Sequence, residues 1–130
     1  MSNLTLVWQG DLKFVNGPDS PTIELHSSTP GVTSPTQALA YAVMACMGMD
    51  VVHILQKGRH DLQALTVTIE TTRAQEHPRR YTSIHLHFQL TGNIPDAAVE
   101  RAIELSRTTY CSVLSSLRPD IEFKATFTVK

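Results

Sequence analysis

A long apolar helix is the feature that most constrains the fold of this chain. It begins at a Ser-Pro-Thr-Gln sequence, where Ser34 suits the N-cap and Gln37 suits the third position of a capping box. Helical periodicity then continues to about Lys57, and Gly58 suits the residue just beyond the C-terminus. Because apolar residues occupy much of its circumference, we expect this helix to be central and buried. Its predicted inner stripe consists of Leu39, Ala42, Val43, Cys46, Met49 and His53.

Strand-like segments flank this helix on both sides. Short strands are expected over residues 4–8, 12–15 and 22–26, followed by a loop rich in Ser, Thr, Pro and Gly. Clean alternation of apolar and polar residues predicts later strands over 65–70, 84–90 and 121–129. A second helix is expected over 95–117, with inner positions at Val99, Ile103, Ser106, Tyr110, Val113 and Leu117. Its residues 106–109 are poor helix formers, so a break is expected just before Tyr110. The pattern predicts one α+β domain over residues 1–130.

The composition excludes several functional classes. The chain has 130 residues, of which 42% are hydrophobic and 18% charged, with a formal net charge of -1. This balance argues against nucleic-acid binding or attachment to an anionic membrane. The N-terminus lacks the pattern of a secretory signal, and the apolar run over 38–49 is short for a membrane span. We therefore expect a soluble cytoplasmic protein.

The two cysteines are the residues best suited to carry chemistry. Cys46 and Cys111 are 65 positions apart, form no Cys-x-x-Cys motif, and match no structural zinc spacing. In a reducing compartment a structural disulfide is disfavoured, which leaves reactive thiols or inert buried ones. The residues alone leave both alternatives open, and they predict no cofactor and no metal.

Several segments, in order along the chain, resemble one known family. They are Ser-Pro-Thr-Gln-Ala-Leu at 34–39, Ala-Cys-Met at 45–47, Asp-Val-Val-His-Ile-Leu-Gln-Lys at 50–57, His-Pro-Arg-Arg-Tyr at 77–81, the run 99–106 and Tyr-Cys-Ser-Val at 110–113. Together they resemble the cysteine helix, central hairpin and second cysteine helix of the OsmC/Ohr family, the osmotically inducible protein C and organic hydroperoxide resistance proteins. The resemblance extends over roughly residues 30 to 129 and is closest to the OsmC-like branch.

This resemblance implies an OsmC-like fold, with antiparallel sheets around two long central helices in an intertwined homodimer. It also implies a thiol-dependent reductase of hydroperoxides that acts in oxidative stress defence. Cys46 would be the peroxidatic thiolate that becomes a sulfenic acid. Cys111 would be the resolving thiol that condenses with it to a disulfide, which an external dithiol then reduces.

The sequence departs from the family at its activating residues. Hydroperoxide resistance members use an arginine from the N-terminal region and a glutamate near the start of the cysteine helix. Here the glutamate position falls at Thr36 or Gln37, and no arginine precedes Arg59. Possible auxiliary residues are Gln37, Asp50 and His53. Because the usual activators are missing, two alternatives stay open: a non-enzymatic small-molecule binding protein and a slow redox sensor.

Overall fold

The computed structural model describes residues 3–130. It comprises two compact units, one ending at Tyr41 and the other running from Ala42 to Lys130. The prediction of a single domain stays a prediction, since the arrangement of the two units is not determined.

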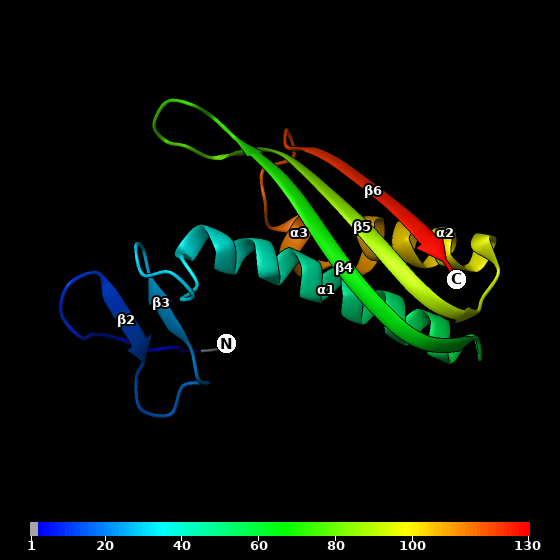
Figure 1. Ribbon diagram of the computed structural model, residues 1–130, viewed down its shortest axis with the longest axis horizontal. Helices are drawn as coiled ribbons and strands as arrows, with labels where there is room; N and C mark the ends of the chain where they lie inside the picture. The colour runs from blue at the N-terminus through cyan, green and yellow to red at the C-terminus, as the bar shows by residue number, and fades with distance from the viewer. Residues whose placement is uncertain (1–2) are drawn as a thin grey trace. The chain divides into compact units, whose positions relative to one another are not determined.

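The N-terminal unit contains a three-stranded antiparallel sheet in the order β1-β2-β3, of which Figure 1 labels β2 and β3. Its strands are β1 (Leu6–Trp8), β2 (Lys13–Asn16) and β3 (Glu24–His26). The turn between β1 and β2 passes through Gly10 with φ 91°, a backbone conformation that favours glycine. The three predicted short strands are confirmed, with slightly different bounds.

The predicted helix start is confirmed in atomic detail. Helix α1 (Pro35–Lys57) is preceded by Ser34, whose amide donates to Gln37 Oε1 at 3.0 Å. In return, the Gln37 amide donates to Ser34 Oγ at 3.3 Å, which completes the capping box. The helix end differs slightly from expectation, because the left-handed residue is Arg59 (φ 60°) rather than Gly58.

The buried face of α1 differs from the predicted stripe. From Ala42 onward, the fully buried side chains occur at every fourth residue: Val43, Met47, Val51 and Leu55. Met49 is 70% exposed and His53 is also exposed, so both predictions of inward positions were wrong. Cys46 lies beside the buried row and is partly exposed. The helix is apolar around most of its circumference, so periodicity alone could not select the face that meets the sheet.

Helix α1 is also long and apolar enough to cross a membrane by length and composition. The sequence had led us to expect that its apolar run would be too short. Core helices of soluble proteins meet the same criterion, and the row from Val43 to Leu55 is buried against this protein's own sheet.

The second unit is built on a sheet in the order β4-β5-β6. Strands β4 (Asp61–Arg73) and β5 (Tyr81–Asn93) form an antiparallel hairpin. Strand β6 (Glu122–Val129) pairs with β5 in parallel, which corrects the expectation of purely antiparallel sheets. The long helical connection returns the chain to the beginning of β5, so the two strands run in the same direction.

One face of this sheet forms the core. Ile84, Leu86, Phe88 and Leu90 are buried, as their alternation predicted. The strand register places Val67 and Phe127 beside Phe88 on the same face. A Cβ atom added at Gly48 would lie 3.6 Å from Val67, so α1 packs on this face. Figure 1 shows α1 lying along the hairpin of β4 and β5.

The opposite face of the sheet is polar, as predicted. His85 Nε2 lies 3.1 Å from Thr126 Oγ1, and His87 Nδ1 lies 2.7 Å from the same oxygen. These contacts join one nitrogen of each imidazole to the sheet.

The second helix is interrupted beside the second cysteine. Helix α2 (Asp96–Leu105) continues into a π-helical turn, η1 (Ser106–Tyr110), and a short helix, α3 (Ser112–Ser115), follows Cys111. A break is present, but it lies at Cys111 rather than just before Tyr110, and the π turn that precedes it changes which residue faces inward. A π turn takes up one residue more than an α turn, and the Cys111 amide donates to Ser106 O at 2.8 Å. Cys111 is consequently buried, whereas Tyr110, the predicted inner residue, is 58% exposed.

Candidate functional site

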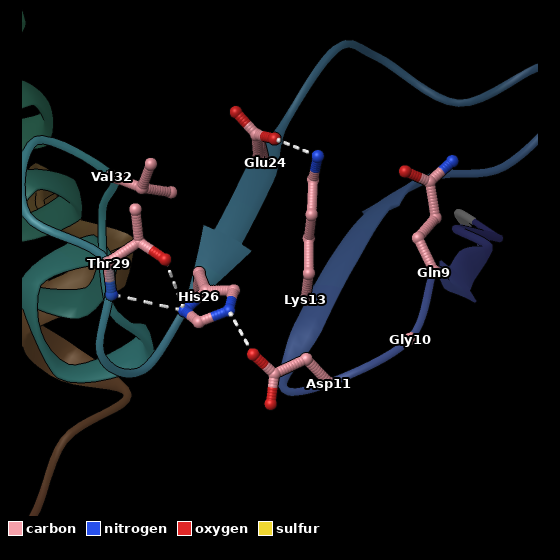
Figure 2. A pocket seen from close by; sticks show the side chains of 8 residues that line it. All are labelled: Gln9, Gly10, Asp11, Lys13, Glu24, His26, Thr29 and Val32. Atoms are coloured by element: carbon pink, nitrogen blue, oxygen red, sulfur yellow. Dashed lines mark hydrogen bonds and ion pairs between the residues drawn. The ribbon is translucent and has the colours of Figure 1, made fainter.

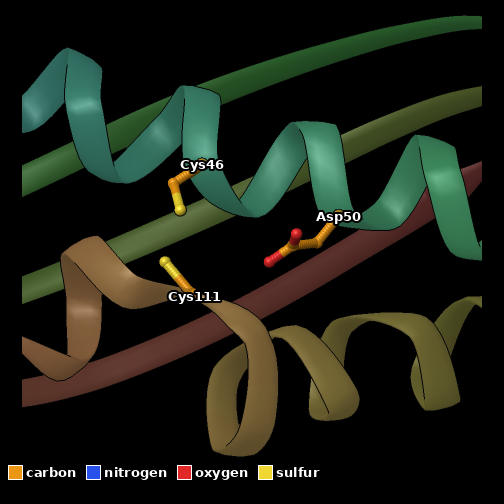
Figure 3. Close-up of side chains that lie close together, drawn as sticks. All are labelled: Cys46, Asp50 and Cys111. Carbon is orange, nitrogen blue, oxygen red and sulfur yellow. The ribbon is translucent and has the colours of Figure 1, made fainter.

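The fold brings the two cysteines together. Cys46 extends from the middle of α1 and Cys111 from the junction between η1 and α3, and Figure 3 shows the two thiols facing each other. Both thiols are free. Their sulfur atoms and a carboxylate oxygen of Asp50 all lie within 4.8 Å of one another. We call Cys46, Asp50 and Cys111 the thiol cluster.

Asp50 is fixed in the cluster by a buried hydroxyl. It follows Cys46 by one helical turn on α1, so the two side chains occupy neighbouring positions on the helix surface. Ser106, which is fully buried in the π turn, donates its hydroxyl proton to Asp50 Oδ2 at 2.8 Å. This bond joins α1 to the turn that carries Cys111.

The surroundings of Cys111 hold its thiol in the protonated form. Burial is the main cause that raises the pKa of Cys111 to about 11; the neighbouring Cys46 thiol and Asp50 carboxylate act in the same direction, and the Leu114 amide acts against them. That amide donates to Cys111 Sγ at 3.3 Å. Both charged neighbours that act on this pKa in the described chain, Cys46 and Asp50, raise it.

The other two predicted auxiliary residues are placed differently. Gln37 uses its side-chain oxygen in the capping box of α1 and belongs to the N-terminal unit. His53 is exposed on α1 and is not part of the thiol cluster in the described chain. Their proposed auxiliary roles stay predictions.

A second polar site, which sequence reasoning missed, lies within the N-terminal unit. A hollow of about 370 Å³ is lined mainly by polar residues around His26, which is only 8% exposed (Figure 2). His26 Nδ1 accepts hydrogen bonds from the amides of Ser28 and Thr29, each at 3.1 Å. Its Nε2 lies 3.6 Å from Asp11 Oδ2. These contacts anchor the loop after β3, a structural role that explains the buried imidazole.

Comparison with known proteins identifies the family. The model of the family described as OsmC-like protein matches residues 28–126. The chain belongs to the OsmC-like family. It is 41% identical to Protein YhfA of Escherichia coli K12 over 97 residues, which are 74% of this chain and 72% of that protein.

Solved structures agree with this assignment of the OsmC-like fold. A hypothetical protein from Aquifex aeolicus VF5 superposes with a TM-score of 0.91 and 26% identity, covering 100% of this chain and 96% of that one. An organic hydroperoxide resistance protein OsmC from Legionella pneumophila superposes with a TM-score of 0.76 and 17% identity, covering 99% and 98%. At 17% identity, the similarity to the Legionella protein shows a shared fold only.

The raised pKa of Cys111 predicts a pH dependence of stability for this OsmC-like protein. The folded-state pKa of about 11 lies above the ordinary value of 9.0, so folding favours the protonated thiol. That contribution is fully present below pH 9 and is lost as the pH rises through 9 to 11. We expect the free energy of unfolding to fall more steeply over this range in the reduced wild-type protein than in Cys111→Ser. Urea unfolding at several pH values measures both slopes, and equal slopes would contradict the prediction.

Proposed function

We propose that this OsmC-like protein is a thiol-dependent hydroperoxide reductase that works through Cys46 and Cys111. The observation that carries the proposal is the position of the two sulfur atoms, within 4.8 Å of each other on separate helical segments. A pair of free thiols this close needs only side-chain adjustment to reach disulfide bonding distance.

The proposed reduction of a hydroperoxide proceeds in three steps. The Cys46 thiolate attacks the peroxide O–O bond, becomes a sulfenic acid, and releases an alkoxide that takes up a proton to give the alcohol. The Cys111 sulfur then attacks the sulfenic acid, a disulfide forms, and water leaves. An external dithiol donates two electrons and two protons to restore both thiols. The reducing cytoplasm, where such dithiols are kept reduced, is the compartment that suits this cycle.

Differences in exposure support the division of roles between the cysteines. Cys46 is partly exposed, so a peroxide can reach its sulfur, whereas Cys111 is 1% exposed. A resolving thiol must meet only the sulfenic acid beside it, and burial protects it from the substrate.

A slow redox sensor is the second candidate function. The electrostatics favour it, because a pKa of about 11 leaves only about one Cys111 in 10⁴ as thiolate at pH 7. The family's activating glutamate position is occupied by Thr36 or Gln37, and the acidic side chain beside the thiols is Asp50, which raises the pKa of Cys111. Such a cluster forms a disulfide slowly, and its oxidised state persists as a signal.

Peroxide consumption distinguishes the two candidates. The reduced protein is mixed with cumene hydroperoxide, with and without a dithiol reductant, and free thiols and remaining peroxide are both counted. A reductase loses two thiols per peroxide and turns over many times when the dithiol is supplied. A sensor loses the same two thiols but consumes about one peroxide per chain on the same timescale. Unchanged protein thiols in the arm without the dithiol, with peroxide unconsumed in both arms, would contradict both functions.

We also propose that the functional form is a homodimer. The N-terminal unit exposes a set of large apolar side chains: Leu4, Leu6, Val7, Trp8, Leu12, Phe14 and Ile23. Trp8 is 63% exposed, which is unusual for so large a side chain in a monomer. A second copy of the chain would bury this surface.

Light scattering coupled to size exclusion tests the homodimer. We expect a mass of twice the 14.4 kDa of one chain. We also expect Trp8→Lys to move the population toward monomer, because it places a charge within the apolar surface. Lys124→Glu, a change on β6 outside this apolar set, serves as the control and should leave the mass unchanged. A monomeric wild-type protein would contradict the proposal.

A further inference from the structure

The thiol cluster has the ligand set of a metal site. It offers two sulfur atoms and one carboxylate oxygen, all within 4.8 Å of one another (Figure 3). We propose that the reduced thiol cluster binds a thiophilic divalent cation of the Zn²⁺ or Cd²⁺ type, with Cys46, Cys111 and Asp50 as ligands. Binding does not depend on the proposed reductase activity, since it involves no oxidation.

The separations between the ligand atoms suit such an ion. Zn²⁺ binds thiolate sulfur at about 2.3 Å and carboxylate oxygen at about 2.0–2.2 Å, so two of these ligand atoms on one tetrahedral ion lie roughly 3.5–3.8 Å apart. The three ligand atoms already lie within 4.8 Å of one another, so only a small shortening of these separations is needed. Cys46 and Asp50 are one turn apart on α1, and small side-chain rotations bring them and Cys111 onto one ion.

The charge balance of the cluster also favours a cation. Asp50 places a carboxylate oxygen beside both sulfur atoms, within 4.8 Å, so an anionic oxygen ligand accompanies the two thiols. The same carboxylate assists metal binding, because a divalent ion offsets the charges of Asp50 and of both thiolates. On binding, each thiol releases one proton to solvent and its sulfur forms a bond to the metal.

Ser106 supplies the outer support that metal ligands require. Its fully buried hydroxyl donates to Asp50 Oδ2 at 2.8 Å and so holds the carboxylate in place beside the sulfur atoms. Such outer hydrogen bonds orient carboxylate ligands and affect metal affinity about 10- to 100-fold. Two thiolates select soft ions over Mg²⁺ or Ca²⁺, and three protein ligands leave the fourth tetrahedral position to water.

Titration of the reduced full-length protein with Cd²⁺ under anaerobic conditions tests this site. The ultraviolet charge-transfer band from thiolate to Cd²⁺ reports sulfur ligation and is insensitive to the six histidines. We expect one Cd²⁺ per chain at saturation, protection of both thiols from a thiol reagent, and no band with Mg²⁺. Cys46→Ser and Cys111→Ser should each reduce the band to about half or abolish it.

Carboxylate variants make the test specific. We expect Asp50→Asn to weaken Cd²⁺ binding by about tenfold or more, and Ser106→Ala by about tenfold. Asp96→Asn, at the exposed start of α2, is the matched control and should bind like the wild type. Circular dichroism of each variant confirms that it is folded. Absence of the band in wild type, or an unchanged affinity in a folded Asp50→Asn, would overturn the proposal. Peroxide-driven thiol loss, measured separately on metal-free protein, tests the reductase proposal independently.

Discussion

Replacing Cys46 with serine should abolish peroxide reduction. The serine hydroxyl is a far weaker nucleophile than a thiolate and forms no sulfenic acid, so we expect turnover to fall by about 10³-fold or more. Coupled consumption of the dithiol reductant measures the rate. The substitution removes one sulfur atom from a partly exposed position, so the fold should be kept.

Cys111→Ser is the matched variant, because it removes the other sulfur of the same cluster. We expect it to react once with peroxide and to accumulate a sulfenic acid on Cys46, which a dimedone adduct detects by mass. Further peroxide should drive Cys46 to the sulfinic acid, since no second thiol intercepts it. The assignment of roles would be contradicted if Cys46→Ser kept its turnover, or if the sulfenic acid appeared on Cys111 in Cys46→Ser.

Phe88→Ala should cause the largest loss of stability among single substitutions in the sheet. Phe88 is fully buried in the middle of β5, beside Val67 on β4 and Phe127 on β6. Truncation of a buried phenylalanine removes its transfer free energy and leaves a cavity, which costs about 3–5 kcal/mol. Chemical denaturation of the reduced protein measures this change.

Gln89→Ala provides the control in the adjacent position. Gln89 is exposed and points to the opposite face of β5, so its truncation should change the free energy of unfolding by less than about 0.5 kcal/mol. Equal losses for the two variants would show that the face of the sheet that carries Phe88 is not the core.

The sequence predicted most of the architecture because local signals were strong. The capping box formed by Ser34 and Gln37 defined the start of α1, and the alternation from Ile84 to Leu90 identified the core face of β5. These features depend on short-range hydrogen bonding and on periodicity, which a sequence displays directly. The parallel pairing of β5 with β6 depends on the path of a long connection, so strand patterns could not reveal it.

The candidate site was only partly visible in the sequence. Cys46 and Cys111 could be selected through family resemblance, and the poor helix formers after Leu105 indicated a break. The π turn was not foreseen, and it is this turn that buries Cys111 and exposes Tyr110. Ser106 was read as an ordinary inner residue, because its bond to Asp50 joins residues 56 positions apart. A contact of that kind becomes apparent only in three dimensions.

Disulfide mapping after a single equivalent of peroxide tests the central claim most directly. The reduced protein is treated with one cumene hydroperoxide per chain, alkylated, digested without reduction, and analysed by mass spectrometry. If the thiol cluster is a redox pair, the peptides containing Cys46 and Cys111 will be joined by a disulfide within one chain, and the dithiol will separate them. Recovery of both cysteines as free alkylated thiols, while the peroxide remains unconsumed, would contradict the claim.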